Sequence, residues 1–141
     1  MSSGGQNTTK IDYSSSLYLH PSDAHNPFTV EQLQGSNNYR CWRRTFSICL
    51  ATRRKLGFVT GGEKRDESDK VKQEAWDLCN SMVMSWILGS VSESIRKSVM
   101  FMSTAEAIWR HLEARFCISN GARKSQLSKM LFEKKQSNRP I

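Results

Sequence analysis

Residues 75–88, Ala-Trp-Asp-Leu-Cys-Asn-Ser-Met-Val-Met-Ser-Trp-Ile-Leu, decide the fold, because this stretch is apolar on nearly every side. Two apolar stripes run through it at helical spacing: Val71, Ala75, Leu78 and Met82, and Trp76, Cys79, Val83, Trp86 and Ile87. Together they cover more than the single face of a surface helix. We therefore expect a central, buried helix. The uninterrupted apolar run is too short to span a bilayer, so no membrane association is expected.

The totals indicate one folded domain. The chain has 141 residues, of which 38% are hydrophobic and 24% charged, and a domain of this size buries roughly two-thirds of its unfolded surface. The four cysteines, Cys41, Cys49, Cys79 and Cys117, form no C-x-x-C pair, and the polar N-terminus has no signal-peptide core. We expect an intracellular protein, cytoplasmic with the nucleus as the alternative, whose thiols are reduced and buried.

The N-terminal third divides into a tail and a helix. Residues 1–16 are small, polar and without period, which predicts a disordered tail. The following segment should run extended into a turn at Pro21. A helix is expected over residues 38–56, with Gly57 as its left-handed C-cap. Its apolar face comprises Tyr39, Trp42, Phe46, Cys49, Leu50 and Leu56.

Capping signals delimit the helices that follow. Ser68 or Asp69 should cap the central helix, and Gly89 should end it. A capping box that begins at Ser90 opens a short helix with Ile95 and Val99 on its apolar side.

A second capping signal, at residues 103–106, opens a stronger helix. Its buried side should comprise Ala105, Ile108, Trp109, Leu112 and Phe116. A last helix is expected over residues 123–135, and residues 136–141 should fray. With no confident strand, the prediction is an all-α fold: a single small bundle of about five helices within residues 17–135.

The net charge of +8 lies mainly in two basic blocks. The block within residues 40–60 contains cations and no acidic residue: Arg40, Arg43, Arg44, Arg53, Arg54 and Lys55. The block within residues 121–141 contains cations and the single acid Glu133: Arg123, Lys124, Lys129, Lys134, Lys135 and Arg139. Such blocks attract phosphate backbones or anionic membranes, although a solvated helix face has the same composition.

Motifs of catalysis and of metal binding are not found. The sequence contains no G-x-S-x-G, no H-E-x-x-H and no Gly-rich phosphate loop. The three histidines, His20, His25 and His111, do not cluster with cysteines as a zinc site requires. We therefore expect no enzyme, no metal or other cofactor and no small-molecule substrate.

Several motifs occur together in one order. They are Tyr18-Leu19-His20-Pro21-Ser22-Asp23, Leu33-x-Gly35-x-x-Asn38-Tyr39-x-x-Trp42, Lys55-Leu56-Gly57-Phe58-Val59-x-Gly61 and the long run from Trp76 to Ser92. With them the sequence resembles the N-terminal region of Gag from plant copia-type LTR retrotransposons, the copia-like N-terminal domain. The positions that carry the family motif and the expected core are Tyr39, Trp42, Trp76, Cys79, Trp86, Ile87, Trp109, Leu112 and Phe116.

The resemblance implies a non-enzymatic structural protein. Its copies, or other Gag chains, would associate into the shell of a virus-like particle that encloses RNA. Two features depart from the family: one extra residue lies between Gly35 and Asn38, and the expected C-terminal zinc knuckle, C-x-x-C-x-x-x-x-H-x-x-x-x-C, is not found in these 141 residues. We therefore expect a truncated or relic copy. The alternative is a nucleic-acid-binding module that uses the two basic blocks, and the two hypotheses are compatible.

Overall fold

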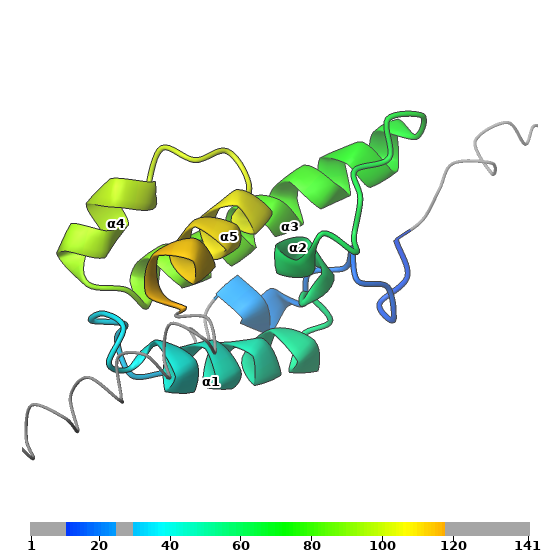
Figure 1. Cartoon of the computed structure of the whole chain (residues 1–141). Helices are drawn as coiled ribbons and strands as arrows, with labels where there is room; N and C mark the ends of the chain where they lie inside the picture. The colour runs from blue at the N-terminus through cyan, green and yellow to red at the C-terminus, as the bar shows by residue number, and fades with distance from the viewer. Residues whose placement is uncertain (1–10, 25–29, 118–141) are drawn as a thin grey trace, which may run out of the picture.

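The computed structural model describes residues 11–24 and 30–117, and these residues form a helical molecule (Figure 1). Its helices are the 3₁₀-helix η2 (Pro21–Ala24) and the α-helices α1 (Tyr39–Thr52), α2 (Gly57–Thr60), α3 (Lys70–Gly89), α4 (Glu93–Val99) and α5 (Ala105–Phe116). The β-structure in this part of the chain is a single bridge between Leu33 and Val91. The predicted all-α class is therefore confirmed.

Helix α1 is shorter than the helix predicted over residues 38–56. It ends at Thr52, Arg54 then adopts a left-handed backbone with φ 59°, and the short helix α2 begins at Gly57. The left-handed residue predicted at Gly57 is therefore Arg54, directly after the C-cap of α1, and the left-handed Gly61, with φ 86°, ends α2. A left-handed conformation costs a residue with a Cβ roughly 1–2 kcal/mol. The sequence pattern therefore predicted that the helix ends at Gly57, whereas α1 ends at Thr52.

Helix α3 begins and ends where predicted, but less of its surface is buried than predicted. Asp69 caps it by accepting hydrogen bonds from the backbone N–H groups of Val71 at 3.0 Å and Lys72 at 3.2 Å, and the helix ends at Gly89. One stripe is buried at Cys79, Val83, Trp86 and Ile87. On the other stripe Leu78 is 58% exposed. The prediction of burial on nearly every side is wrong, because neighbouring helices cover only one side of α3.

Leu33 and Trp42 hold the connection between α3 and α4 by hydrogen bonds. Leu33 donates from its N–H to the Ser90 carbonyl at 3.0 Å and accepts from the Ser92 N–H at 2.9 Å. The indole N–H of Trp42 donates to the same Ser90 carbonyl at 2.9 Å, inside the core. These bonds tie the start of α1 to the C-terminal end of α3.

Hydroxyl side chains cap helices α4 and α5. Ser92, and not Ser90 as predicted, caps α4, and its Oγ accepts from the Ile95 N–H at 3.5 Å. Thr104 caps α5, where its Oγ1 accepts from the Ala107 N–H at 3.1 Å. The capping signals therefore located both helices, although the first signal was placed two residues early.

Asn80 of α3 fastens the start of α5 to the bundle. Its Oδ1 accepts from the Ala105 N–H at 2.9 Å, and its Nδ2 donates to the Ser103 carbonyl at 3.2 Å. Asn80 is itself buried. A buried amide with both ends bonded fixes the position of one helix against another, because leaving either end unpaired would be costly.

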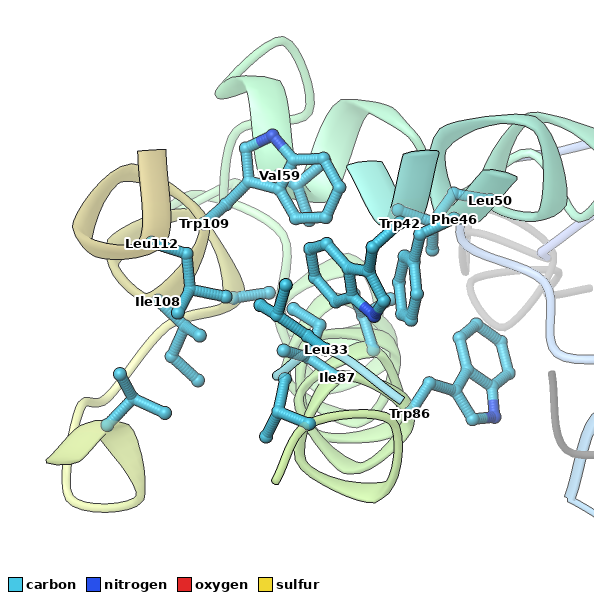
Figure 2. Packing of buried hydrophobic residues seen from close by; sticks show 14 of the residues in the cluster. Leu33, Trp42, Phe46, Leu50, Val59, Trp86, Ile87, Ile108, Trp109 and Leu112 are labelled. Atoms are coloured by element: carbon cyan, nitrogen blue, oxygen red, sulfur yellow. The ribbon is translucent and has the colours of Figure 1, made fainter. Parts of the chain in front are cut away.

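Trp109 of α5 packs against two aromatic rings of α1. Its ring centroid is 5.5 Å from that of Trp42 and 5.8 Å from that of Phe46, and the rings of Trp42 and Phe46 are 5.0 Å apart. Figure 2 shows Trp42 between Trp109 and Phe46. Each such pair contributes about 0.5–1.5 kcal/mol beyond the burial of its area. This cluster joins α1 to α5.

The prediction that all four thiols are buried is wrong. Cys79 is buried, Cys49 is partly exposed, and Cys41 and Cys117 are exposed; all four are free. The helical period placed Cys49 on the apolar face of α1, yet that face is narrower than the spacing suggested. Among the described helices, none combines the length and the hydropathy needed to cross a bilayer.

Some predicted segments lie outside the described residues. These are the first part of the predicted tail, residues 1–10, the predicted last helix over residues 123–135 and the frayed end at residues 136–141. Residues 11–16 of the predicted tail form hydrogen-bonded turns, in which the Ser15 N–H donates to the Asp12 carbonyl at 2.8 Å. Helix α2 was not predicted, because its four residues are too few to show a period.

Candidate functional site

The basic block of residues 40–60 divides between the two ends of α1. A groove of about 330 Å³ lies along the N-terminal half of the helix. This arginine groove is lined by Tyr39, Arg40, Arg43, Arg44, Ser47 and Cys117. The lining brings together three guanidinium groups and a serine hydroxyl. Such a set donates hydrogen bonds and carries positive charge, which are the properties that suit an anion.

The three arginines of the groove have different surroundings. Arg40 and Arg44 are exposed and lie one helical turn apart. Arg43 is half-buried, because its guanidinium pairs with the Glu113 carboxylate and lies 5.9 Å from the ring centroid of Trp109. Arg40 and Arg44 carry like charges one turn apart, and such a pair destabilises a helix by about 0.2–0.5 kcal/mol. Two of the three positive charges therefore face solvent.

Tyr39 contributes a buried hydroxyl to the groove. Its side chain is 1% exposed, and its oxygen has no hydrogen-bond partner among the described residues. Burial raises the pKa of this phenol to about 12, while Arg43 acts to lower it and Glu113 to raise it. A buried donor without an acceptor costs about 1–3 kcal/mol. The hydroxyl is therefore protonated at neutral pH and enclosed by its neighbours.

A second hollow lies beyond the C-terminal end of α1, under residues 11–24, which we call the strap. Its volume is about 320 Å³. This strap pocket is lined by Tyr13, Ser15, Tyr18, His20, Ser22, Asp23, Thr52, Arg53 and Arg54. Hydroxyl groups dominate the lining, and the rings of Tyr18 and His20 meet edge to face at 4.8 Å between centroids. The Asp23 carboxylate accepts from the backbone N–H of His20 at 3.0 Å.

The cations at this end of α1 hold the structure together. Arg53 lies over the indole of Trp86, 4.8 Å from the ring centroid, and the Arg54 guanidinium donates to the Ser14 carbonyl. Lys55 is 1% exposed, and its Nζ donates to the carbonyl of Tyr18 at 2.7 Å and to that of Arg53 at 3.1 Å. Burial lowers the pKa of the Lys55 ammonium. The prediction that Lys55 contacts nucleic acid is wrong, because the strap covers it.

Cys79 completes the attachment of the strap, a contact that no sequence pattern indicated. Its Sγ donates to the Leu17 carbonyl at 3.2 Å, and burial raises the pKa of the thiol to about 11. Leu17 and Leu19 pack against the core. A segment of small polar residues followed by two leucines has no period that would predict docking.

The predicted family-motif residues lie in and around one core. Tyr39, Trp42, Cys79, Trp86, Ile87, Trp109 and Leu112 are buried. Trp76 and Phe116 are partly buried and pack against the same cluster, with the ring of Trp76 5.6 Å from that of Phe58. These residues position α1 and are not a binding surface. The predicted contacts Arg123, Lys124, Lys134 and Lys135 lie outside the described residues.

The side chains described here do not assemble a metal site. Within residues 11–24 and 30–117, no three His, Cys, Asp or Glu side chains are close enough to hold an ion together. The chemistry that the two hollows offer is hydrogen-bond donation and positive charge.

A comparison with family models finds a match to part of the chain. Residues 20–64 match the family described as Gag-polypeptide of LTR copia-type, a structural and non-catalytic family. The matched segment contains α1 and α2 and most of the side chains that line the two hollows. The resemblance found in the sequence is therefore confirmed over these residues. No curated protein and no solved structure matches the chain.

Proposed function

We propose that this Gag-like retrotransposon chain is a structural module that associates with copies of itself, as a unit of a particle shell. The observation that carries the proposal is the match of residues 20–64 to the copia-type Gag polypeptide. The fold is compatible with this role, because most of the described aromatic residues are used in the core, while Phe101 is exposed.

The turn between α4 and α5 offers an apolar surface for such a contact. Phe101 is 90% exposed and Met100 is 43% exposed, while Met102 packs partly against the core. The turn is held by a hydrogen bond from the Met102 N–H to the Val99 carbonyl at 3.1 Å. Aromatic side chains that are exposed in the free protein and buried in a complex supply much of the binding energy at interfaces.

Sedimentation of the purified chain across a concentration range tests the proposal. We expect large species to grow with concentration without added RNA. Replacing Phe101 by Ala should weaken the association by about 30-fold or more, since interface hot spots contribute at least about 2 kcal/mol. Leu78→Ala is the control, because Leu78 is also an exposed apolar side chain and lies on a different helix, α3.

One result would refute self-association, and another would remove only the surface proposed for it. A chain that remains monomeric at high concentration, and that does not enter particles formed by a longer Gag, would refute the proposal itself. Association that Phe101→Ala and Leu78→Ala weaken equally would keep the proposal and remove the α4–α5 turn as its surface. Circular dichroism of each variant shows that the fold is retained.

A second candidate function is binding of nucleic acid through the exposed side of α1. The observation that favours it is the exposure of Arg40 and Arg44 beside Arg43 in one groove. Contacts to phosphates release counterions, so binding should weaken steeply as salt is added. Binding to single-stranded RNA that does not change with salt would exclude this function.

A further inference from the structure

An exposed stripe of apolar and small side chains lies on the outer side of α1. Cys41, Thr45 and Ile48 form it, at the spacing that places side chains on one face of a helix. Ile48 is 47% exposed, and Cys41 and Thr45 are exposed as well. The core side of the same helix is formed by Trp42 and Phe46. Within the described part of the chain, the stripe therefore faces solvent.

The stripe borders an open hollow beside two arginines. This α1 hollow, of about 530 Å³, is lined by Asn37, Arg40, Cys41, Arg44 and Thr45. Arg40 and Arg44 also line the arginine groove, so their side chains form the ridge between the two hollows. A guanidinium group is attracted to the face of an aromatic ring, and its alkyl stem packs on apolar atoms. The α1 hollow is therefore suited to an aromatic side chain.

The turn between α4 and α5 carries such a side chain. Phe101 is 90% exposed, and an aromatic side chain buries about 150–250 Å² when it is covered. Residues 98–105 contain no charged side chain, so the turn brings no cation toward the arginines of the ridge. Lys97, which precedes this segment, pairs with Glu93 at 3.3 Å. The ring of Phe101 and the α1 hollow are therefore complementary in charge and in polarity.

The two surfaces lie at opposite edges of the molecule, the turn at one edge and α1 at the other (Figure 1). Phe101 does not reach the α1 hollow of its own chain, so only another copy brings the two together. A contact between two turns would use the same surface on both copies and would stop at a dimer, whereas a contact between different surfaces continues into rings or longer arrays. A particle shell requires the second kind, because each copy must bind more than one neighbour.

We propose that Phe101 of one copy inserts into the α1 hollow of a second copy, beside Arg40 and Arg44, with Ile48 at the edge of the contact. The inference rests on the proposed self-association and names the second surface that it uses. One aromatic side chain buries much less than the roughly 1,200–2,000 Å² of stable complexes. We therefore expect a single contact to be weak and to require high protein concentration or covalent trapping for its detection.

Cross-linking through the native Cys41 tests the contact. Met100→Cys places a thiol beside Phe101, which is retained, and Cys49→Ser with Cys117→Ser removes the other partly or fully exposed thiols. Oxidation by copper phenanthroline at high protein concentration should join the introduced thiol of one copy to Cys41 of the next. The expected result is a ladder of dimers, trimers and longer chains on a non-reducing gel. Adding Cys41→Ser should abolish every band beyond the dimer.

Sedimentation of two complementary variants tests the contact without thiols. Phe101→Ala removes the ring and keeps the α1 hollow, whereas Thr45→Arg fills the hollow and keeps the ring. Each variant alone should associate at least 10-fold more weakly than the wild type. An equimolar mixture should form dimers and no larger species, because the intact turn of one variant binds the intact hollow of the other. Leu78→Ala is the control and should associate within 2-fold of the wild type.

The outcomes separate this contact from the self-association on which it rests. Association that Phe101→Ala weakens and Thr45→Arg leaves unchanged, with cross-linking that stops at dimers, would overturn the α1 hollow and keep the turn as a surface. A wild-type chain that stays monomeric at high concentration would overturn both proposals. If Arg40→Gln with Arg44→Gln abolishes RNA binding and leaves association unchanged, the ridge belongs to RNA and the insertion of Phe101 is overturned. Circular dichroism of every variant shows that the fold is retained.

Discussion

At its N-terminal end α1 exposes Arg40 and Arg44 along the arginine groove, whereas Arg54 and Lys55, beyond its C-terminal end, donate to carbonyl oxygens of the strap. In the sequence these cations belong to one basic block. In the fold the first pair is available to a ligand, and the second pair holds residues 11–24 against the bundle. A count of charges therefore does not distinguish a binding surface from a structural contact; the acceptors that surround each cation do.

The physical difference between the two ends lies in the acceptors. Exposed arginines are solvated by water and contribute little to stability. A buried ammonium has lost its water, and only protein acceptors replace that hydration. For Lys55 these acceptors are the carbonyl groups of Tyr18 and Arg53. Substitutions at the two ends should consequently affect different properties, namely ligand affinity at the groove and the free energy of unfolding at the strap.

Replacing Lys55 by Ala should produce the largest effect. The change removes a fully buried side chain and leaves two carbonyl oxygens without their donor, so we expect the free energy of unfolding to fall by about 2–4 kcal/mol. Arg44→Ala at the exposed end should change it by less than about 0.5 kcal/mol. Urea unfolding followed by circular dichroism measures both. Equal effects of the two substitutions would contradict the proposed division of α1.

The pH dependence of stability should identify Cys79 as part of the strap attachment. The folded protein holds this thiol protonated up to a pKa of about 11, against an ordinary value of 9.0, so above pH 9 the unfolded state loses a proton that the folded state keeps. Stability then falls with rising pH by up to about 1.4 kcal/mol per unit. Lys55 makes stability rise with pH. Its pKa is lower in the folded state than the ordinary value of 10.5, so below pH 10.5 the unfolded state binds more protons.

Comparing the wild type with Cys79→Ala isolates the thiol from Lys55 and Tyr39, which titrate in both proteins. We expect Cys79→Ala to be the less stable protein at pH 7 and the difference in free energy of unfolding to narrow by about 1–2 kcal/mol between pH 9 and 10.5. Urea titrations at several pH values measure it. A difference that stays constant over this range would indicate that the thiol is not held protonated by burial.

Periodicity and capping residues predicted the helices that pack through long apolar faces. The aromatic face of α1 and, to within one residue, the caps of α3 and α5 were readable, because each depends on residues close in sequence. The exposure of Leu78 was not, since helical spacing cannot say whether a neighbour covers the second stripe of α3. Signals from residues close in sequence therefore predict helices better than they predict which side chains are buried.

The candidate site was predicted in part for the same reason. Arg40, Arg43 and Arg44 were proposed from their charge, and the groove that brings them together with Ser47 and Cys117 requires the packing of α5 beside α1. The burial of Lys55 depends on a strap more than thirty residues earlier in the chain. No pattern within either segment indicates that the two meet.

Arg54 gives the smallest effect and the most specific test of the strap end. Its φ of 59° is a conformation that glycine adopts without penalty, so Arg54→Gly removes strain together with the hydrogen bond to Ser14, whereas Arg54→Ala keeps the strain and loses the same bond. We expect the glycine variant to be about 1 kcal/mol more stable than the alanine variant and within about 0.5 kcal/mol of the wild type. Thermal unfolding of the three proteins measures this. If alanine and glycine are equally stable, the left-handed turn stores no strain, and the early end of α1 needs another cause; if they differ as expected, the guanidinium that holds Ser14 offsets the strain of its own backbone.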